Sequence, residues 1–125
     1  VGCASGSDSL LLALMASDIG PGDEVICPSY TFFATAGSIW RLGAKPIFCD
    51  IDPTTYNCTV ETVSDAIGRC KNLKAIMPVH LFGQAVDLDG LMALACENEV
   101  PLIEDAAQGI GCRDATGARV GSRAS

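Results

Sequence analysis

The stretch EVICPSYTFFATAGSIWRLGAKPIFCD, residues 24–50, decides the fold class. Its first part, Glu24–Cys27, is a short apolar run that ends at Pro28, which is typical of a buried β-strand. Thr31–Leu42 carries apolar residues at helical spacing and predicts a helix. Lys45–Cys49 is again short and apolar, so the stretch reads as strand, helix and strand. Strands separated by a helix of about ten residues are typical of a parallel sheet.

The same alternation continues on both sides of this unit. In chain order we expect the end of a strand at residues 1–3, a helix containing Leu10–Met15, a helix after Thr59, a strand at Ala75–Val79, a helix at Leu88–Asn98 and a strand at Pro101–Glu104. We therefore predict an α/β fold with a mostly parallel sheet and helices on both of its faces.

The composition is that of one ordinary globular domain, and it excludes several classes of protein. The 125 residues are 49% hydrophobic and 18% charged, with a formal net charge of −7. Eight lysines and arginines against fifteen acidic residues leave no basic cluster for a row of phosphates, so we expect no nucleic-acid partner. The longest apolar run, Leu10–Ala16, is too short to span a bilayer, so we expect no membrane partner.

The seven cysteines are scattered without any Cys-x-x-Cys pair, and His80 is the only histidine. Zinc sites need paired ligands, so we expect no metal site. The odd number of cysteines, and their places in apolar runs as at Cys27 and Cys49, favour buried and reduced thiols. We therefore expect a cytoplasmic protein.

Polar residues follow the expected strands, where an open α/β sheet binds its ligands. Ser5–Ser9 comes directly before the first helix, whose unpaired N–H groups would suit a phosphate. The alternative is that Ser5 or Ser7 only caps the helix. Asp105 follows the apolar run Pro101-Leu102-Ile103, where a carboxylate needs a cation or hydrogen-bond donors. A protonated pyridine nitrogen would serve, and so would a structural arginine or a helix N-terminus.

Other residues at strand ends allow two interpretations each. Phe32 could stack on a flat ligand or belong to the core, and for a single aromatic residue the core is favoured. His80 could transfer a proton or be a hydrogen-bonded structural residue, and the structural role is favoured. Gln108 is more often a hydrogen-bonding loop residue than a ligand contact. A substrate contact of Asp50 or His80 stays undecided.

Five blocks of sequence, taken in their order, resemble one family of enzymes. They are Ser5–Leu10, Gly20–Val25, Pro28–Phe32, Pro78–Gln84 and Glu104–Gly109, and the third and fifth discriminate best. Together they resemble the DegT/DnrJ/StrS family of sugar aminotransferases over essentially all 125 residues. The resemblance implies fold type I, the aspartate aminotransferase fold, with pyridoxal 5'-phosphate (PLP) as the cofactor.

The resemblance also implies roles at the cofactor for five residues. Ser7 and the backbone at Asp8 would hold the phosphate, which a helix N-terminus can do without a side-chain cation. Phe32 would stack on the pyridine ring, Asp105 would pair with the ring nitrogen, and Gln108 would lie beside the phenolic oxygen. Asp105 would keep the ring nitrogen protonated, which makes the ring an electron sink.

No catalytic residue is expected within these 125 residues. The Schiff-base lysine of the family lies shortly after a Gly-Ser such as Gly121-Ser122, so the resemblance places it beyond Ser125. Lys45, Lys71 and Lys74 do not match it. We expect the chain to be part of a PLP-binding large domain, without the N-terminal arm, the lysine segment and the C-terminal small domain. Alone, it should not transaminate.

The activity that the resemblance implies is transfer of an amino group from glutamate or glutamine to a nucleotide-linked keto-sugar, in a homodimer. One alternative is a dehydratase of the same family, in which histidine replaces the lysine and the same cofactor removes a sugar hydroxyl. Another is a non-catalytic α/β module that uses only the anion site at Ser5–Ser9. The residue at the lysine position would separate the first two.

Overall fold

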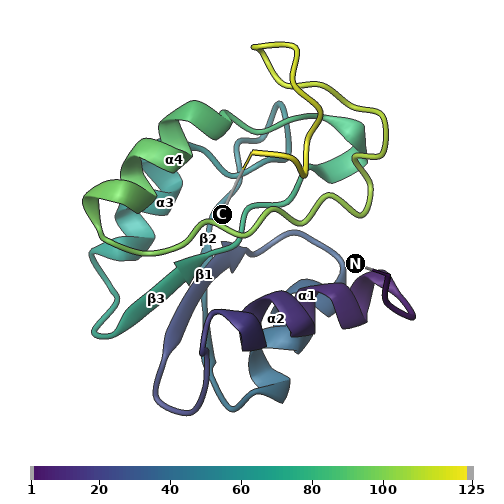
Figure 1. Cartoon of the computed structure of the whole chain (residues 1–125). Helices are drawn as coiled ribbons and strands as arrows, with labels where there is room; N and C mark the ends of the chain where they lie inside the picture. The colour runs from purple at the N-terminus through teal and green to yellow at the C-terminus, as the bar shows by residue number, and fades with distance from the viewer. Residues whose placement is uncertain (1, 124–125) are drawn as a thin grey trace.

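A computed structural model describes residues 2–123 of the chain (Figure 1). Within these residues the elements are, in chain order, α1 (Gly6–Ala16), β1 (Glu24–Pro28), α2 (Phe33–Arg41), β2 (Lys45–Cys49), α3 (Val60–Ile67), β3 (Leu73–Ile76), the short 3-10 helix η1 (Leu81–Gly83) and α4 (Leu88–Glu97). The alternation of strands and helices predicted from residues 24–50 is confirmed.

β1 is the central strand of a sheet in the order β2-β1-β3. Both neighbours run parallel to it, and Ile26 of β1 pairs with Ile47 of β2 and with Ile76 of β3. Parallel neighbours need crossover connections, which α2 supplies between β1 and β2 and α3 between β2 and β3. The predicted α/β fold with a parallel sheet is therefore confirmed.

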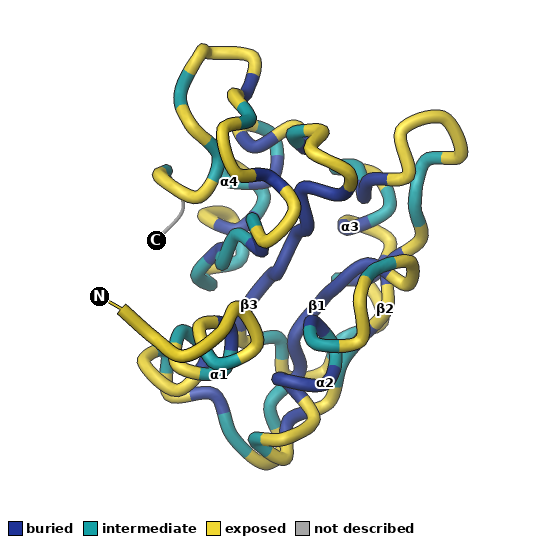
Figure 2. The backbone as a smooth tube through the Cα atoms, turned by 90° about the vertical axis from the view of Figure 1, so that its right-hand side faces the viewer, coloured by how far each residue is buried: buried dark blue, intermediate teal, exposed yellow. Residues whose placement is uncertain are grey.

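Helices cover both faces of this sheet (Figure 1). α1 and α2 pack on one face, where Leu14 and Val25 belong to one core cluster, and α3 and α4 pack on the other, where Leu91 and Ile26 belong to a second. Val25 and Ile26 are neighbours in β1 and point to opposite faces, yet both are fully buried. Figure 2 shows β1 in the colour of buried residues. Burial on both faces explains why β1 reads as one continuous apolar run.

Side chains cap three of the helices at their N-termini. Ser5 caps α1, Thr59 caps α3 and Asp87 caps α4, each by accepting a backbone N–H of the first turn. The predicted helix start after Thr59 is confirmed. α2 begins at Phe33 rather than at the predicted Thr31, because the residue before Phe33 keeps an extended backbone.

The predicted strand at Ala75–Val79 is displaced toward the N-terminus. β3 spans Leu73–Ile76. The N–H of Met77 still donates to the carbonyl of Ile26 at 2.8 Å, but Pro78 has no N–H with which to continue the ladder. Pairing with β1 therefore ends before the predicted boundary.

The prediction of a continuous strand at Pro101–Glu104 is wrong. This segment instead makes two isolated parallel bridges, Ile76 with Leu102 and Val79 with Asp105. Prolines in both facing segments remove N–H donors that a regular ladder would use. The bridges nevertheless carry Asp105 to the carboxyl end of the sheet.

The expected strand end at residues 1–3 is also wrong for the residues that the structure describes. Gly2 and Cys3 lie in no strand, and residue 1 lies outside the described range. A strand needs a hydrogen-bonded neighbour, and the sheet formed within residues 2–123 offers none to this segment. The chain enters α1 directly.

All seven cysteines are free thiols, and the expected burial holds for only three of them. The buried ones are Cys27, Cys49 and Cys58, whereas Cys3 and Cys96 are exposed. Burial, together with the neighbouring Cys49, raises the pKa of the Cys27 thiol to about 12, which keeps it protonated and unreactive. No group of metal-ligating side chains occurs among residues 2–123.

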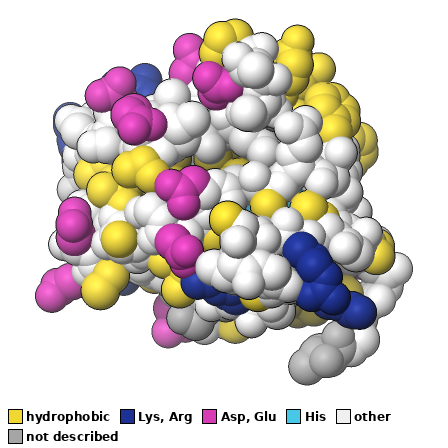
Figure 3. Space-filling view, turned by 90° about the horizontal axis from the view of Figure 1, so that it is seen from above, with side chains coloured by type: hydrophobic (Ala, Val, Ile, Leu, Met, Phe, Trp, Pro, Cys, Tyr) yellow, Lys and Arg dark blue, Asp and Glu magenta, His cyan; other side chains and the backbone are white. Residues whose placement is uncertain are grey.

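The charged surface fits the acidic composition. On the face in Figure 3, acidic side chains are spread over one side, and lysine and arginine side chains show at separate places along the edges. Within the described residues, no helix has the length and apolar character that crossing a bilayer requires.

Glu24, at the start of β1, predicts how acid will affect stability. Its buried carboxylate accepts the N–H groups of Lys71 and Asn72 at 2.6 and 3.0 Å and pairs with Lys45 at 3.2 Å. These partners lower its pKa from 4.5 to about 2. A lowered folded-state pKa adds stability that is complete above the unfolded value near 4.5 and is lost as the pH falls toward 2.

We therefore expect Glu24→Gln to lower the thermal midpoint at neutral pH, with a deficit that shrinks between pH 4.5 and 2. Thermal unfolding of both proteins across this range measures the effect. Glu97→Gln, at the exposed end of α4, is the control and should change little. A deficit of Glu24→Gln that stays constant with pH would contradict the assignment.

Candidate functional site

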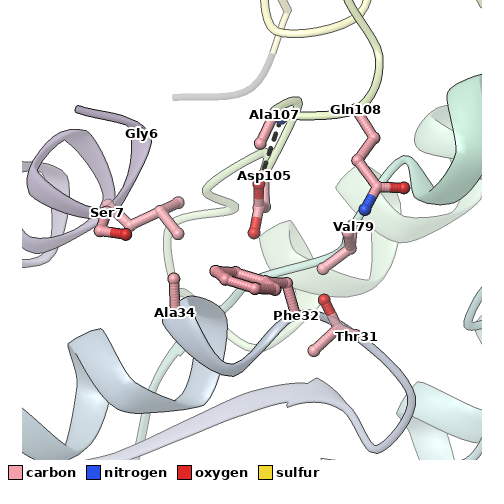
Figure 4. A pocket seen from close by; sticks show the side chains of 10 residues that line it. Gly6, Ser7, Thr31, Phe32, Ala34, Val79, Asp105, Ala107 and Gln108 are labelled. Carbon is pink, nitrogen blue, oxygen red and sulfur yellow. Dashed lines mark hydrogen bonds between the residues drawn. The ribbon is translucent and has the colours of Figure 1, made fainter.

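The carboxyl ends of the strands border an open pocket of about 230 Å³ (Figure 4). Its walls come from the start of α1, the loop from β1 to α2, and the segment 105–108, which begins at the bridge between Val79 and Asp105. The lining residues that carry polar or aromatic chemistry are Ser7, Thr31, Phe32, Asp105 and Gln108. Four of the five residues predicted from the resemblance thus lie around one pocket, and Asp8 does not line it.

Phe32 is the aromatic surface of this pocket. It precedes α2 with an extended backbone (φ −69°, ψ 145°), and its side chain is 70% exposed. Figure 4 shows the ring lying below the Asp105 carboxylate, with one face open to the pocket. The expectation of a core residue, favoured for Phe32 taken alone, is therefore wrong. The backbone turn before α2 directs the ring outward.

Asp105 is the buried acid of the pocket, with 5% exposure. Its backbone is held by two hydrogen bonds, from its N–H to the carbonyl of Pro78 at 2.9 Å and from the N–H of His80 to its carbonyl at 3.0 Å. Its carboxylate accepts the Thr35 hydroxyl at 2.8 Å and the Ala107 N–H at 3.2 Å. Among residues 2–123, no lysine or arginine forms an ion pair with it.

The start of α1 supplies the polar end of the pocket. Gly6 and Ser7 line the wall, and their N–H groups point out of the first turn, which has no preceding turn to accept them. Ser5 is the cap, and its hydroxyl accepts the N–H of Asp8 at 3.2 Å. Of the two serines considered as helix caps, Ser5 is the cap. Ser7 lines the pocket instead, so it is the residue to which the prediction of a phosphate site still applies.

Gln108 has a fixed side-chain orientation. Its Oε1 accepts the N–H of Phe82 at 2.8 Å, and only the oxygen of the amide can do so. The amide nitrogen is therefore left to donate, and in Figure 4 it points toward Val79 at the pocket. Gln108 is a hydrogen-bonding loop residue, as favoured, and it also lines the pocket.

His80 is a structural residue, as favoured from the sequence. Its ring is fully buried, and Nε2 lies 2.9 Å from the Glu104 carboxylate. The N–H of Val86 donates to Nδ1 at 3.3 Å, so Nε2 carries the proton and donates to Glu104. Asp50 is exposed, and neither it nor His80 lines the pocket.

Thr31 and Thr35 are site residues that the sequence reasoning missed. Thr31 lines the pocket, and Thr35 holds the Asp105 carboxylate from α2. Thr31 was visible only as part of the block Pro28–Phe32. No local pattern could have found Thr35, because its partner lies 70 residues away in the chain.

The model of one protein family matches all of residues 1–125. It is the DegT/DnrJ/EryC1/StrS aminotransferase family. The chain belongs to this family. The similarity stated from the five sequence blocks is thereby confirmed.

Curated members of the family are similar over most of this chain. A pleiotropic regulatory protein of Geobacillus stearothermophilus is 51% identical over 113 residues. A UDP-N-acetyl-3-dehydro-alpha-D-glucosamine 3-aminotransferase of Acidithiobacillus ferrooxidans is 50% identical over 113 residues. Each match covers 90% of this chain and 30% of the relative, so the chain spans about a third of their length.

Solved structures of aminotransferases share the fold. DesV of S. venezuelae superposes with a TM-score of 0.88 at 39% identity, covering 94% of this chain and 31% of that one. NtdA of Bacillus subtilis, with its cofactor PMP bound, gives a TM-score of 0.83 at 37% identity, covering 91% and 26%. The expected type I aminotransferase fold is confirmed.

Proposed function

We propose that this chain is the cofactor-binding part of a PLP-dependent nucleotide-sugar aminotransferase. The complete enzyme would move an amino group from glutamate or glutamine to a nucleotide-linked keto-sugar. Family membership and the activity named for the relative in Acidithiobacillus ferrooxidans support the proposal. Because the chain covers 30% of that relative, we propose that the lysine segment and the small domain belong to the remainder of the protein.

The observation that carries this proposal is the buried Asp105 carboxylate beside the exposed ring of Phe32. A buried carboxylate is costly without a positive partner, and the neutral donors Thr35 and Ala107 offset only part of that cost. A protonated pyridine ring resting on Phe32 would bring a positive N–H to Asp105. The residues present therefore fit a pyridoxal ring.

The remaining contacts fit the other polar groups of PLP. The unpaired N–H groups at the start of α1 and the Ser7 hydroxyl would bind the phosphate, aided by the positive end of the helix dipole. The free amide nitrogen of Gln108 would donate to the phenolic oxygen. The backbone N–H of Asp8 already donates to the Ser5 hydroxyl, so it would not be free to bind the phosphate. Asp8 would only form part of the first turn of α1.

When bound, PLP supplies an electron sink that stabilises negative charge at the substrate carbon that loses a proton. Asp105 would keep the ring nitrogen protonated, and Phe32 would hold the ring plane. We propose that the catalytic base is a lysine in another part of the full-length protein, so these two residues would bind and orient the ring without moving that proton. We further propose a homodimer located in the cytoplasm.

A direct test is to purify the full-length protein, add PLP and follow absorbance and amino transfer. We expect a near-visible absorbance band that stays with the protein through gel filtration. We also expect conversion of glutamate to 2-oxoglutarate when a UDP-linked 3-keto-sugar is supplied. A protein that retains no PLP although its lysine is present would contradict the proposal, and loss of a sugar hydroxyl without amino transfer would favour the dehydratase.

Phe32→Ala tests the stacking role. We expect about a fivefold rise in the Kd for PLP, because an aromatic pair contributes about 1 kcal/mol beyond its buried area. Fluorescence titration of the full-length protein with PLP measures this change. Phe48→Ala removes a half-exposed ring of β2 that does not line the pocket, and it should leave the Kd unchanged. Equal effects of both variants would contradict the stacking role.

A further inference from the structure

Thr31 and Thr35 form a chain of hydroxyl groups that ends at Asp105. The hydroxyl oxygens of Thr31 and Thr35 lie 3.0 Å apart, and Thr35 Oγ1 lies 2.8 Å from Asp105 Oδ2. Thr35 is fully buried, whereas Thr31 is part-buried and lines the pocket. The chain of contacts therefore runs from the pocket wall through the start of α2 to the buried carboxylate.

The hydrogen bonds in this chain have one direction. Thr35 has a single hydroxyl proton and donates it to the carboxylate. In the contact between the two threonines Thr35 must then accept, so Thr31 is the donor. Each hydroxyl dipole thus points its positive end toward Asp105, and the two bonds reinforce one another.

Capping of α2 does not account for the Thr35 hydroxyl. The residue at the N-cap is Phe32, which makes no side-chain cap. The N–H of Thr35 donates to the carbonyl of Phe32, and the carbonyl of Thr35 accepts the hydroxyl of Ser38. The backbone is satisfied without the Thr35 hydroxyl, whose contacts are the carboxylate and Thr31.

The two donors to Asp105 fix the plane of its carboxylate. The hydroxyl of Thr35 in α2 donates to Oδ2, and the N–H of Ala107, two residues after Asp105, donates to Oδ1. Each carboxylate oxygen has two lone pairs, so one on each remains for a ligand in the pocket.

We propose that Thr35, supported by Thr31, is a positioning residue that orients the Asp105 carboxylate toward the ring nitrogen of the cofactor. This inference rests on the proposed function. Without the Thr35 hydroxyl, Asp105 would keep only the Ala107 donor on its Oδ1. The carboxylate would then be free to rotate and would hold the ring-nitrogen proton less well.

The test uses the full-length protein with PLP labelled with ¹⁵N in its ring. Thr35→Val keeps the side-chain shape and removes the hydroxyl. We expect the ¹⁵N resonance of the bound ring to move from the protonated toward the unprotonated pyridine value. We expect kcat to fall about tenfold, the effect of one lost hydrogen bond to a charged group. Thr35→Ser keeps the hydroxyl and should give the wild-type ¹⁵N resonance and kcat. Thr31→Val should give a smaller change of both in the same direction as Thr35→Val.

The possible outcomes separate a failure of this inference from a failure of the proposed function. If wild-type protein binds no PLP, the proposed function itself fails. If wild-type protein binds PLP and Thr35→Val gives the wild-type ¹⁵N resonance, only the role of Thr35 is overturned. If Thr35→Val does not fold, Thr35→Ser and Thr31→Val decide: a wild-type ¹⁵N resonance in Thr31→Val, or a shifted one in Thr35→Ser, would overturn the role of the two hydroxyl groups.

Discussion

Replacing Asp105 by alanine in the full-length protein is expected to lower kcat/KM for amino transfer by about a thousandfold or more. The carboxylate is the buried acid of the pocket, and in the proposed function it keeps the ring nitrogen protonated throughout the reaction. Its removal would leave the ring a poor electron sink even where PLP still binds. Steady-state rates with the glutamate donor, together with the Kd for PLP, measure the two effects separately.

Two further variants make this prediction specific. Asp105→Glu keeps the charge but displaces it by one methylene, and it should retain part of the activity. Glu97→Ala removes an exposed carboxylate from the far end of α4 and should leave the rate unchanged. A near-normal rate in Asp105→Ala would contradict the role at the ring nitrogen.

Replacing His80 by alanine is expected to produce the largest loss of stability among these variants, about 3 kcal/mol or more. The side chains of His80 and Glu104 are 0% and 3% exposed, and they lie 2.9 Å apart. The substitution leaves a buried carboxylate without this donor, leaves the N–H of Val86 without its acceptor, and opens a cavity. Urea unfolding of wild type and variant would measure the difference.

Gln84→Ala is the matched control for His80. Gln84 is an exposed residue in the same loop, so its truncation should change stability by less than about 0.5 kcal/mol. Glu104 also accepts the N–H groups of Gly121 and Arg123, which fasten the following loop to the sheet. Similar midpoints for wild type and His80→Ala would contradict the structural role of the pair.

Local sequence was sufficient for the fold class but not for every boundary. β1 was predictable because burial on both faces demands an unbroken apolar run, and Thr59 was predictable because a cap is a local signal. The segment Pro101–Glu104 was not predictable in the same way. Its apolar residues suit a strand, but Pro78 in the facing segment lacks an N–H group and so cannot continue the ladder of hydrogen bonds. Which segment faces it is not a local property of the sequence.

The candidate site was partly predictable for a related reason. Phe32 precedes α2, Ser7 lies in the first turn of α1, and Asp105 and Gln108 lie at and after an isolated bridge to Val79. Such positions converge at the carboxyl edge of a parallel sheet. What each side chain does there depends on its neighbours in space. The preference for Phe32 as a core residue failed because exposure is set by the direction of the backbone before α2.

The sequence by itself determined the α/β class, the family and four of the residues that border the pocket, because periodicity, turn residues and short motifs are local properties of the chain. Only the tertiary structure decided that Thr35 donates to Asp105 and that Gln108 is oriented by Phe82. It also decided that His80 is locked against Glu104. These contacts join residues far apart in the chain, and their geometry exists only after the helices have packed on the sheet.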